Sequence, residues 1–223
     1  MARRGAGYGS EDHFLTYRAA HPATLDRYIQ TAMGTSAPIE WLYPGAMQGE
    51  PKDFTFIPFT PHQAEDWYGF WPRRGNRSWD GVARCGGEWL LFEAKANGGE
   101  LCSPGTAATE KSLAQILAAF RRTKKYLGVP EQVDWHRRYY QYANRLAALY
   151  FLNVAARIPS RLFFLYFTGD CFPDGRPCPA SETEWRPLIK ECHRQLSLAE
   201  QHALSDRVHE LFVPALRRAS APG

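Results

Sequence analysis

Several features that would assign a chain to a familiar class are missing from these 223 residues. No stretch approaches the roughly 20 apolar residues needed to cross a bilayer, and the longest apolar run, residues 162–167, has the length of a strand. The N-terminal segment MARRGAGYGSED has arginines but no apolar segment after them, so it does not resemble a secretory signal. We therefore expect a cytoplasmic protein without a membrane partner.

The cysteines are too few and too scattered for a disulfide framework. The chain has five, an odd number, and no CxxC pair. Cys171 and Cys178 are closest in sequence, and a metal site there is the disfavoured alternative to reduced thiols. A GxxxxGK loop, an HExxH motif and internal repeats are also absent, which argues against P-loop, zincin-like and repeat architectures.

The composition is that of an ordinary globular protein, with 44% hydrophobic and 22% charged residues. The length suits one domain with a sizeable core. We expect a single domain over residues 10–217 between flexible ends at 1–9 and 218–223.

Apolar periodicity, caps and breakers predict the secondary structure. Helices are expected at 11–33 with a break near Pro22, and at 109–127, 135–155, 182–196 and 200–217. The expected N-caps are Ser10, Thr109 and Asp134. Strands are expected at 53–59, on both sides of a turn within 79–96, and at 161–168, while 37–52 is expected to be irregular. This order predicts an α/β chain with a mixed sheet and helices on its faces.

The segment WDGVARCGGEWLLFEAKA, residues 79–96, contains the most informative pattern. A Gly-Gly pair between two β-prone runs is typical of a two-residue hairpin turn. If Gly86 and Gly87 form that turn, Asp80 lies opposite Glu93 with their Cβ atoms about 5 Å apart. Lys95 follows two residues later and so shares that face of the sheet. The pattern thus brings together two carboxylates and an ammonium group.

Two interpretations of this cluster remain open. The carboxylates could lie at an exposed sheet end, with Lys95 as a salt-bridge partner. The apolar run before Glu93 instead favours a buried strand, and acids at its end need a cation. Mg²⁺ accepts one or two carboxylates together with water and phosphate oxygens, so we favour a functional site.

The order of Asp80, a short hairpin, Glu93-Ala94-Lys95 and a long helix resembles the PD-(D/E)xK nuclease superfamily. The resemblance implies a restriction-endonuclease-like core of a helix, three antiparallel strands, a helix and a further strand, here with extra helices. It covers residues 10–168, and Trp79 stands where the motif's proline is expected. The WD…EAK and YYQYANRLA stretches also resemble uncharacterised bacterial proteins.

The resemblance also implies a role for each motif residue. Asp80 and Glu93 would ligate Mg²⁺ or Mn²⁺, and the carbonyl of Ala94 would complete the metal shell. Lys95 would activate the attacking water and stabilise the developing charge.

The superfamily often places an extra glutamate on its first helix. Glu40, Glu65 and Glu11 are candidates, and Glu100 is a further one. We favour Glu40, since Ile39-Glu40-Trp41 could enter a short helix beside the sheet; the alternative for Glu40 is a surface position. Gln141 is a second accessory candidate.

Basic residues gather in one part of the chain. Residues 107–161 hold ten basic and three acidic residues, a net charge of +7. Such a block is a candidate polyanion-binding surface, and solvated helix faces are the alternative. Gln141 and Arg145 lie four residues apart and so share a helix face. The predicted nucleic-acid contacts are Arg121, Arg122, Lys124, Lys125, Arg138 and Arg145.

The sequence therefore predicts a metal-dependent nuclease that acts on DNA, with RNA as a further possibility. One alternative is a non-catalytic nucleic-acid-binding or interaction module on the same fold. Another is a hydrolase of a different phosphate ester. Metal-dependent cleavage of nucleic acid separates these functions.

Overall fold

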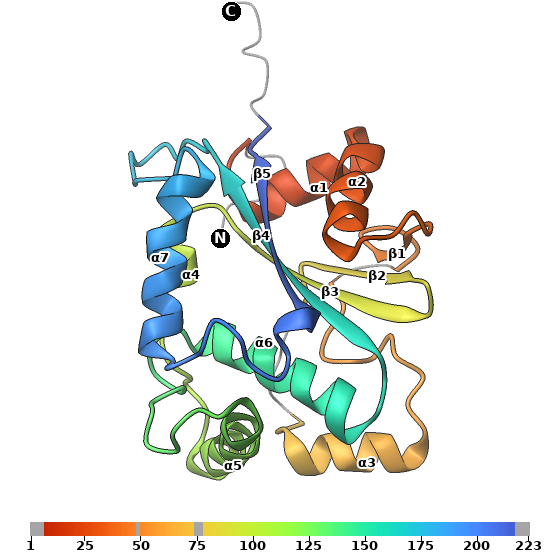
Figure 1. Ribbon diagram of the computed structural model, residues 1–223, viewed down its shortest axis with the longest axis vertical. Helices are drawn as coiled ribbons and strands as arrows, with labels where there is room; N and C mark the ends of the chain where they lie inside the picture. The colour runs from red at the N-terminus through yellow and green to blue at the C-terminus, as the bar shows by residue number, and fades with distance from the viewer. Residues whose placement is uncertain (1–6, 48–49, 74–77, 217–223) are drawn as a thin grey trace, which may run out of the picture.

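A computed structural model describes residues 7–47, 50–73 and 78–216, and it has a mixed α/β architecture (Figure 1). Five strands form one sheet in the spatial order of the sequence. They are β1 Glu40–Tyr43, β2 Gly81–Cys85, β3 Glu88–Lys95, β4 Ser160–Thr168 and β5 Val208–Pro214. The first three strands pair antiparallel, and β3, β4 and β5 run parallel to one another. The expected mixed sheet is confirmed.

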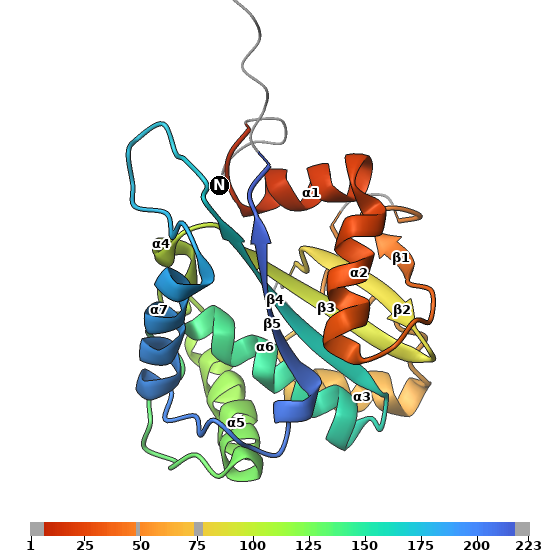
Figure 2. The same cartoon turned by 45° about the horizontal axis from the view of Figure 1, so that its top comes forward.

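Helices cover both faces of the sheet (Figures 1 and 2). One face carries α1 Ser10–Ala20 and α2 Pro22–Met33. The other carries α3 Pro61–Phe70, α5 Glu110–Leu127, α6 Tyr140–Tyr150 with its π-helical extension Phe151–Ala155, and α7 Glu182–Gln195. The remaining short elements are α4 Gly98–Leu101 and a 3₁₀ turn, Ser205–Arg207. No helix in the described ranges is long and apolar enough to span a membrane.

The alternation of side chains along β3 divides the core in two. Leu90 and Phe92 pack against α1 and α2, whereas Leu91 packs on the opposite face, beneath α6. Glu93 and Lys95 follow the parity of Leu91, so they point toward the α6 side. The period of two in the sequence thereby decides which helix meets the charged residues at the end of the strand.

Several predicted elements are confirmed. The helical segment is interrupted between α1 and α2, and Pro22 is the first residue of α2. Helix α5 is capped by Gly128 in the left-handed conformation that glycine favours (φ 73°). The apolar run expected as a buried strand is β4, the central parallel strand. The helix expected at 182–196 is α7.

Other predictions are wrong at the level of local structure. Gly9, not Ser10, occupies the N-cap of α1. Asp134 accepts backbone N–H groups of His136 and Arg137 in a turn, and the helix begins only at Tyr140. Residues 53–59 form a turn followed by irregular backbone instead of a strand, and 37–52 contains β1.

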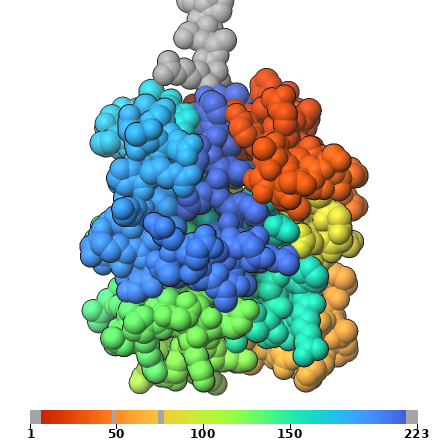
Figure 3. All heavy atoms as spheres, viewed as in Figure 1, coloured from red at the N-terminus to blue at the C-terminus, as the bar shows by residue number. Residues whose placement is uncertain are grey.

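The largest error concerns the last segment. Residues 200–217 were predicted to be helical, but the described part forms the 3₁₀ turn and β5. Val208–Pro214 pairs along its length with β4, so a parallel partner distant in sequence outweighs the local preference. In Figure 3 the last described residues, in dark blue, separate α7 from the red N-terminal helices.

The predicted flexible ends are only partly described. Residues 1–6 and 217–223 lie outside the described residues. Gly9 donates its backbone N–H to the Asp170 carboxylate over 2.8 Å, and Tyr8 packs edge-on against Phe172. The segment before α1 is therefore held against the loop after β4 by non-covalent contacts. These two segments together form one side of the cleft described next.

Candidate active site

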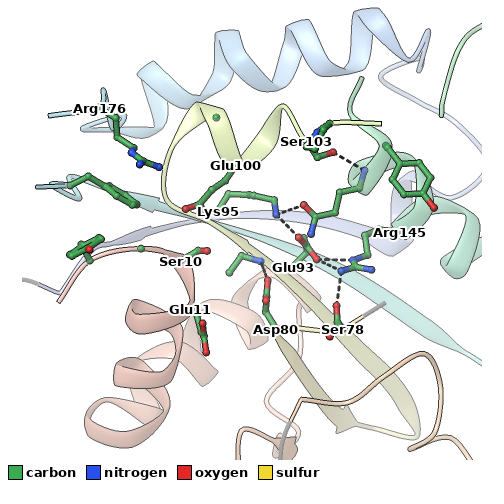
Figure 4. A pocket seen from close by; sticks show the side chains of 18 of the residues that line it. Ser10, Glu11, Ser78, Asp80, Glu93, Lys95, Glu100, Ser103, Arg145 and Arg176 are labelled. Atoms are coloured by element: carbon green, nitrogen blue, oxygen red, sulfur yellow. Dashed lines mark hydrogen bonds and ion pairs between the residues drawn. The ribbon is translucent and has the colours of Figure 1, made fainter. Parts of the chain in front are cut away.

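A cleft of about 740 Å³ opens where β3 and β4 end. Its wall comes from the start of α1, the end of β3, the first turns of α6 and the loop after β4 (Figure 4). The charged residues that line it are Glu11, Glu50, Asp80, Glu93, Lys95, Glu100, Arg145, Asp174 and Arg176. Six acidic and three basic residues make the cleft formally negative. A phosphate group would need additional positive charge to bind there.

The hairpin brings the predicted motif together. Cys85 pairs with Glu88 and Gly81 with Phe92, so the expected register is confirmed. Asp80 immediately precedes the first paired residue, and its Oδ2 accepts the backbone N–H of Ala94 over 2.7 Å. Asp80, Glu93, Ala94 and Lys95 all line the cleft.

Glu93 is held by two cations. Its Oε1 bonds to the Lys95 ammonium group, and its Oε2 accepts from the Arg145 guanidinium, with Nε at 2.7 Å and Nη2 at 2.6 Å. The Glu93 side chain is 1% exposed and that of Arg145 is 4% exposed. The carboxylate is therefore neutralised in a largely water-free environment, where such pairs need several hydrogen bonds to offset desolvation.

The basic partners of Glu93 are themselves fixed by α6 and its surroundings. Arg145 donates from Nη2 to the Ser78 carbonyl over 2.7 Å, and its guanidinium lies over the Trp79 ring at 4.4 Å. Lys95 also donates to Gln141 Oε1 over 2.9 Å. The four-residue spacing of Gln141 and Arg145 thus places both on the helix face that meets the end of β3 (Figure 4).

The pKa values of the two carboxyl groups, Asp80 and Glu93, are shifted in opposite directions. Burial, followed by the nearby negative charge of Glu93, raises the pKa of Asp80 to about 7. Burial would also raise the pKa of Glu93, but Arg145 and Lys95 outweigh it and hold that pKa below its usual value. Two neighbouring carboxyl groups with divergent pKa values are typical of functional sites. Among the described residues, Lys95 and Arg145 form ion pairs with Glu93 and not with Asp80, although their charges partly offset the rise in the pKa of Asp80.

The glutamates that line the cleft do not include the one favoured from sequence as an accessory residue. Glu40 is exposed on edge strand β1, opposite Arg84, so the short helix expected there is wrong and Glu40 does not line the cleft. Glu65 is exposed on α3. Glu11, in the first turn of α1, and Glu100, in α4, do line the cleft. Figure 4 shows Glu11 on α1 and Glu100 near the end of β3, where the Glu100 carboxylate accepts the backbone N–H of Ala96 over 2.8 Å.

The predicted nucleic-acid contacts divide into two groups. Arg121 pairs with Glu131, the Lys124 ammonium group binds the carbonyls of Glu131 and Val133, and Arg122 lies over the Phe70 ring. These side chains, Lys125 and the exposed Arg138 do not line the cleft. Arg145 does, but as the buried partner of Glu93. A direct phosphate contact by Arg145 would therefore require breaking a buried pair.

The donor set suits a hard divalent cation. No group of three or more His, Cys, Asp and Glu in the described ranges is gathered closely enough to hold a metal. Mg²⁺ needs only one or two protein carboxylates, because water and substrate phosphate complete its shell. Asp80 has a pKa that burial and Glu93 have raised, which is the condition that a bound cation relieves. The residues present therefore fit such an ion, and Asp80 would be its principal ligand.

Some cleft residues were not anticipated. Ser103 accepts the backbone N–H of Gln141 over 2.9 Å, and Phe172 and Arg176 come from the loop after β4. No sequence pattern indicated them, because they are brought to β3 by the tertiary fold. Glu11, by contrast, was a candidate from sequence, since it is an acidic residue at the start of the first helix.

Comparisons with protein-family models, characterised proteins and solved structures found no match for this chain.

Proposed function

We propose that this protein is a metal-dependent phosphodiester hydrolase that cleaves nucleic acid, with DNA as the favoured substrate. The observation that carries the proposal is the meeting of Asp80, Glu93 and Lys95 at the floor of one acidic cleft. The succession of α1 and α2, antiparallel β1 to β3, α5 and α6, and parallel β4 also supports a restriction-endonuclease-like core. The proposal includes a cytoplasmic location.

Each residue of the cleft floor has a role in this mechanism. Asp80, Glu93 and the Ala94 carbonyl would hold Mg²⁺ or Mn²⁺, which polarises the phosphate and lowers the pKa of the attacking water. Lys95, held by Glu93 and Gln141, places a positive charge where negative charge develops on the phosphate. Arg145 fixes the orientation of Glu93 from the other side.

The same contacts favour one competing function. Both oxygens of Glu93 are engaged by cations, an arrangement that a static structural network would also have. If these contacts are only structural, the protein is the non-catalytic module named above, which would bind nucleic acid without cleaving it. Under the catalytic proposal, Glu93 would hold a divalent cation in addition to its two basic partners, so calorimetry would detect metal binding.

Cleavage assays with matched variants test the proposal. Plasmid, linear duplex, single-stranded DNA and RNA would be incubated with Mn²⁺, Mg²⁺ or EDTA. Asp80→Ala should lose both cleavage and calorimetric metal binding. Lys95→Ala should keep metal binding and lose on the order of 10²–10³ in rate. Glu40→Gln, an exposed acid outside the cleft, is the control and should match the wild type.

Two results would reject the catalytic function. One is undiminished cleavage in excess EDTA or by Asp80→Ala. The other is nucleic-acid binding by the wild type with no cleavage under any metal condition, which would favour the non-catalytic module.

A further inference from the structure

The loop after β4 forms a stack of an arginine on an aromatic ring at one side of the cleft. The Arg176 guanidinium lies over the Phe172 ring at 4.6 Å, and Tyr8 meets that ring edge-on with centroids 5.0 Å apart. All three side chains line the cleft. Figure 4 shows Arg176 at the end of the cleft opposite Arg145, with Asp80, Glu93 and Lys95 between them.

Arg176 is held in this position by Asp174. Its Nε is 2.9 Å from each carboxylate oxygen, and Nη2 also bonds to Oδ2. A guanidinium fixed at two points loses little further freedom when a planar group stacks on it. The pair with Asp174 neutralises the charge, yet about half of the Arg176 side chain stays exposed (49%). The exposed face of the Arg176 guanidinium therefore offers a planar surface for stacking. Binding to this face does not require a net positive charge, because Asp174 neutralises it.

We propose that this stack receives a nucleobase, so that the substrate enters the cleft as a single strand. The inference rests on the proposed function and specifies its substrate class. Bases of any sequence stack on aromatic rings and on arginine planes, which is how proteins bind single strands without reading sequence. In a duplex the faces of the bases are covered by their neighbours and cannot reach the Arg176 surface.

The dimensions of the cleft support the same substrate class. Its volume falls in the range of about 300–1,000 Å³ that encloses a drug-sized ligand, which matches a short piece of one strand and not a double helix. Glu93 and Lys95 are recessed at its floor, with side chains 1% and 7% exposed. A phosphodiester must therefore enter the cleft to reach them, as a nucleotide does in enzymes that act on unpaired or extruded nucleotides.

Binding measured without cleavage tests this inference. A fluorescein-labelled single-stranded oligonucleotide and its matched duplex would be titrated by anisotropy with Ca²⁺ in place of Mg²⁺. Arg176→Gln and Phe172→Leu should weaken single-strand binding by about 5- to 150-fold, the typical effect of losing one stacked base. Arg194→Gln is the matched control, because Arg194 is also an exposed arginine paired with a carboxylate, Glu191, but lies outside the cleft.

A small substrate separates this inference from the proposed function. Mn²⁺-dependent hydrolysis of bis(p-nitrophenyl) phosphate by the wild type tests the chemistry of the cleft floor, and Arg194→Gln should hydrolyse it at the wild-type rate because Arg194 lies outside the cleft. Equal binding of the single strand by wild type, Arg176→Gln and Phe172→Leu would overturn the stacking site while leaving hydrolysis intact. Tighter binding of the duplex would also overturn it. If wild type hydrolyses neither the diester nor nucleic acid, the proposed function fails, and the anisotropy comparison still decides whether a base stacks on Arg176.

Discussion

Helices α5 and α6 both carry basic side chains, but they place them in opposite surroundings. On α5, Arg121 is 62% exposed and pairs with the equally exposed Glu131. On α6, Arg145 is 4% exposed and pairs with the buried Glu93. The two helices pack against each other, so the difference comes from the direction in which each basic face points.

The comparison shows that charge density along the chain does not locate the site. On α5, Arg121 faces solvent, where water screens its charge, and the buried Lys124 binds loop carbonyls. The polar face of α6 meets the carboxyl end of β3, where Glu93 and Lys95 leave the apolar core. A single buried arginine there is coupled to a carboxylate more strongly than several exposed ones. The experiments below separate the two helices on that basis.

The largest expected effect is on stability. Arg145→Met removes one cation from Glu93 and leaves a buried carboxylate partly uncompensated, which typically costs about 3–5 kcal/mol. Arg121→Met removes an exposed ion-pair partner and should cost less than about 1 kcal/mol. Urea denaturation of both variants measures the difference. Equal midpoints would show that burial of the α6 arginine carries no energetic weight.

The second effect concerns the pH dependence of the cleft floor. The pKa of Asp80 is about 7 in the folded protein and about 4 when unfolded. Folded Asp80 therefore retains its proton, and its contribution to stability declines as pH rises from about 4 to about 7, by up to about 4 kcal/mol. Asp80→Asn should remove this decline, and Mg²⁺ should restore stability to the wild type at pH 8.

The difference between wild type and Asp80→Asn is the quantity to measure. His193 and His209 have pKa values lowered to about 4, first by burial, so their contribution to stability rises with pH between about 4 and 6.5. This opposite trend is common to both proteins and cancels in the difference. Parallel stability curves from pH 4 to 8 would contradict the assignment to Asp80.

A smaller effect is expected from the glutamines of the two helices. Gln141→Leu removes the acceptor that holds Lys95 and should slow cleavage about tenfold, since hydrogen bonds to charged groups contribute roughly 1.5–3 kcal/mol. Metal affinity should not change. Gln115→Leu on α5 removes a hydrogen bond to the Tyr68 carbonyl and should leave the rate unaltered. Equal rates for both variants would show that the orientation of Lys95 does not depend on Gln141.

The smallest effect is expected on α5 itself. Reversing Arg121, Arg122 and Lys125 to Glu alters only side chains outside the cleft. The slope of log affinity against log salt should stay within about one phosphate contact of the wild type, roughly 0.7 for a single strand. A slope that falls by the equivalent of two or more phosphate contacts would show that α5 binds nucleic acid. Lys124 is left unchanged because its own side chain is buried and its ammonium group binds the carbonyls of Glu131 and Val133.

The hairpin and the motif were determined by the sequence itself. Gly86 and Gly87 both take positive φ values, 56° and 86°, and a two-residue turn fixes register and side-chain parity together. From that local rule followed the shared cleft of Asp80, Glu93 and Lys95. Gln141 and Arg145 were placed on one face by helix periodicity alone.

Only the tertiary structure decided what surrounds this motif. Glu11 lines the cleft and Glu40 does not, because the start of α1 reaches the end of β3, while Glu40 lies on the edge strand opposite Arg84. Likewise, β5 forms because β4 offers an open parallel edge, against the helix that local residues predicted. Turns and periodicities depend on neighbours in sequence, whereas counter-ions, cleft walls and parallel strands depend on residues that meet only after folding.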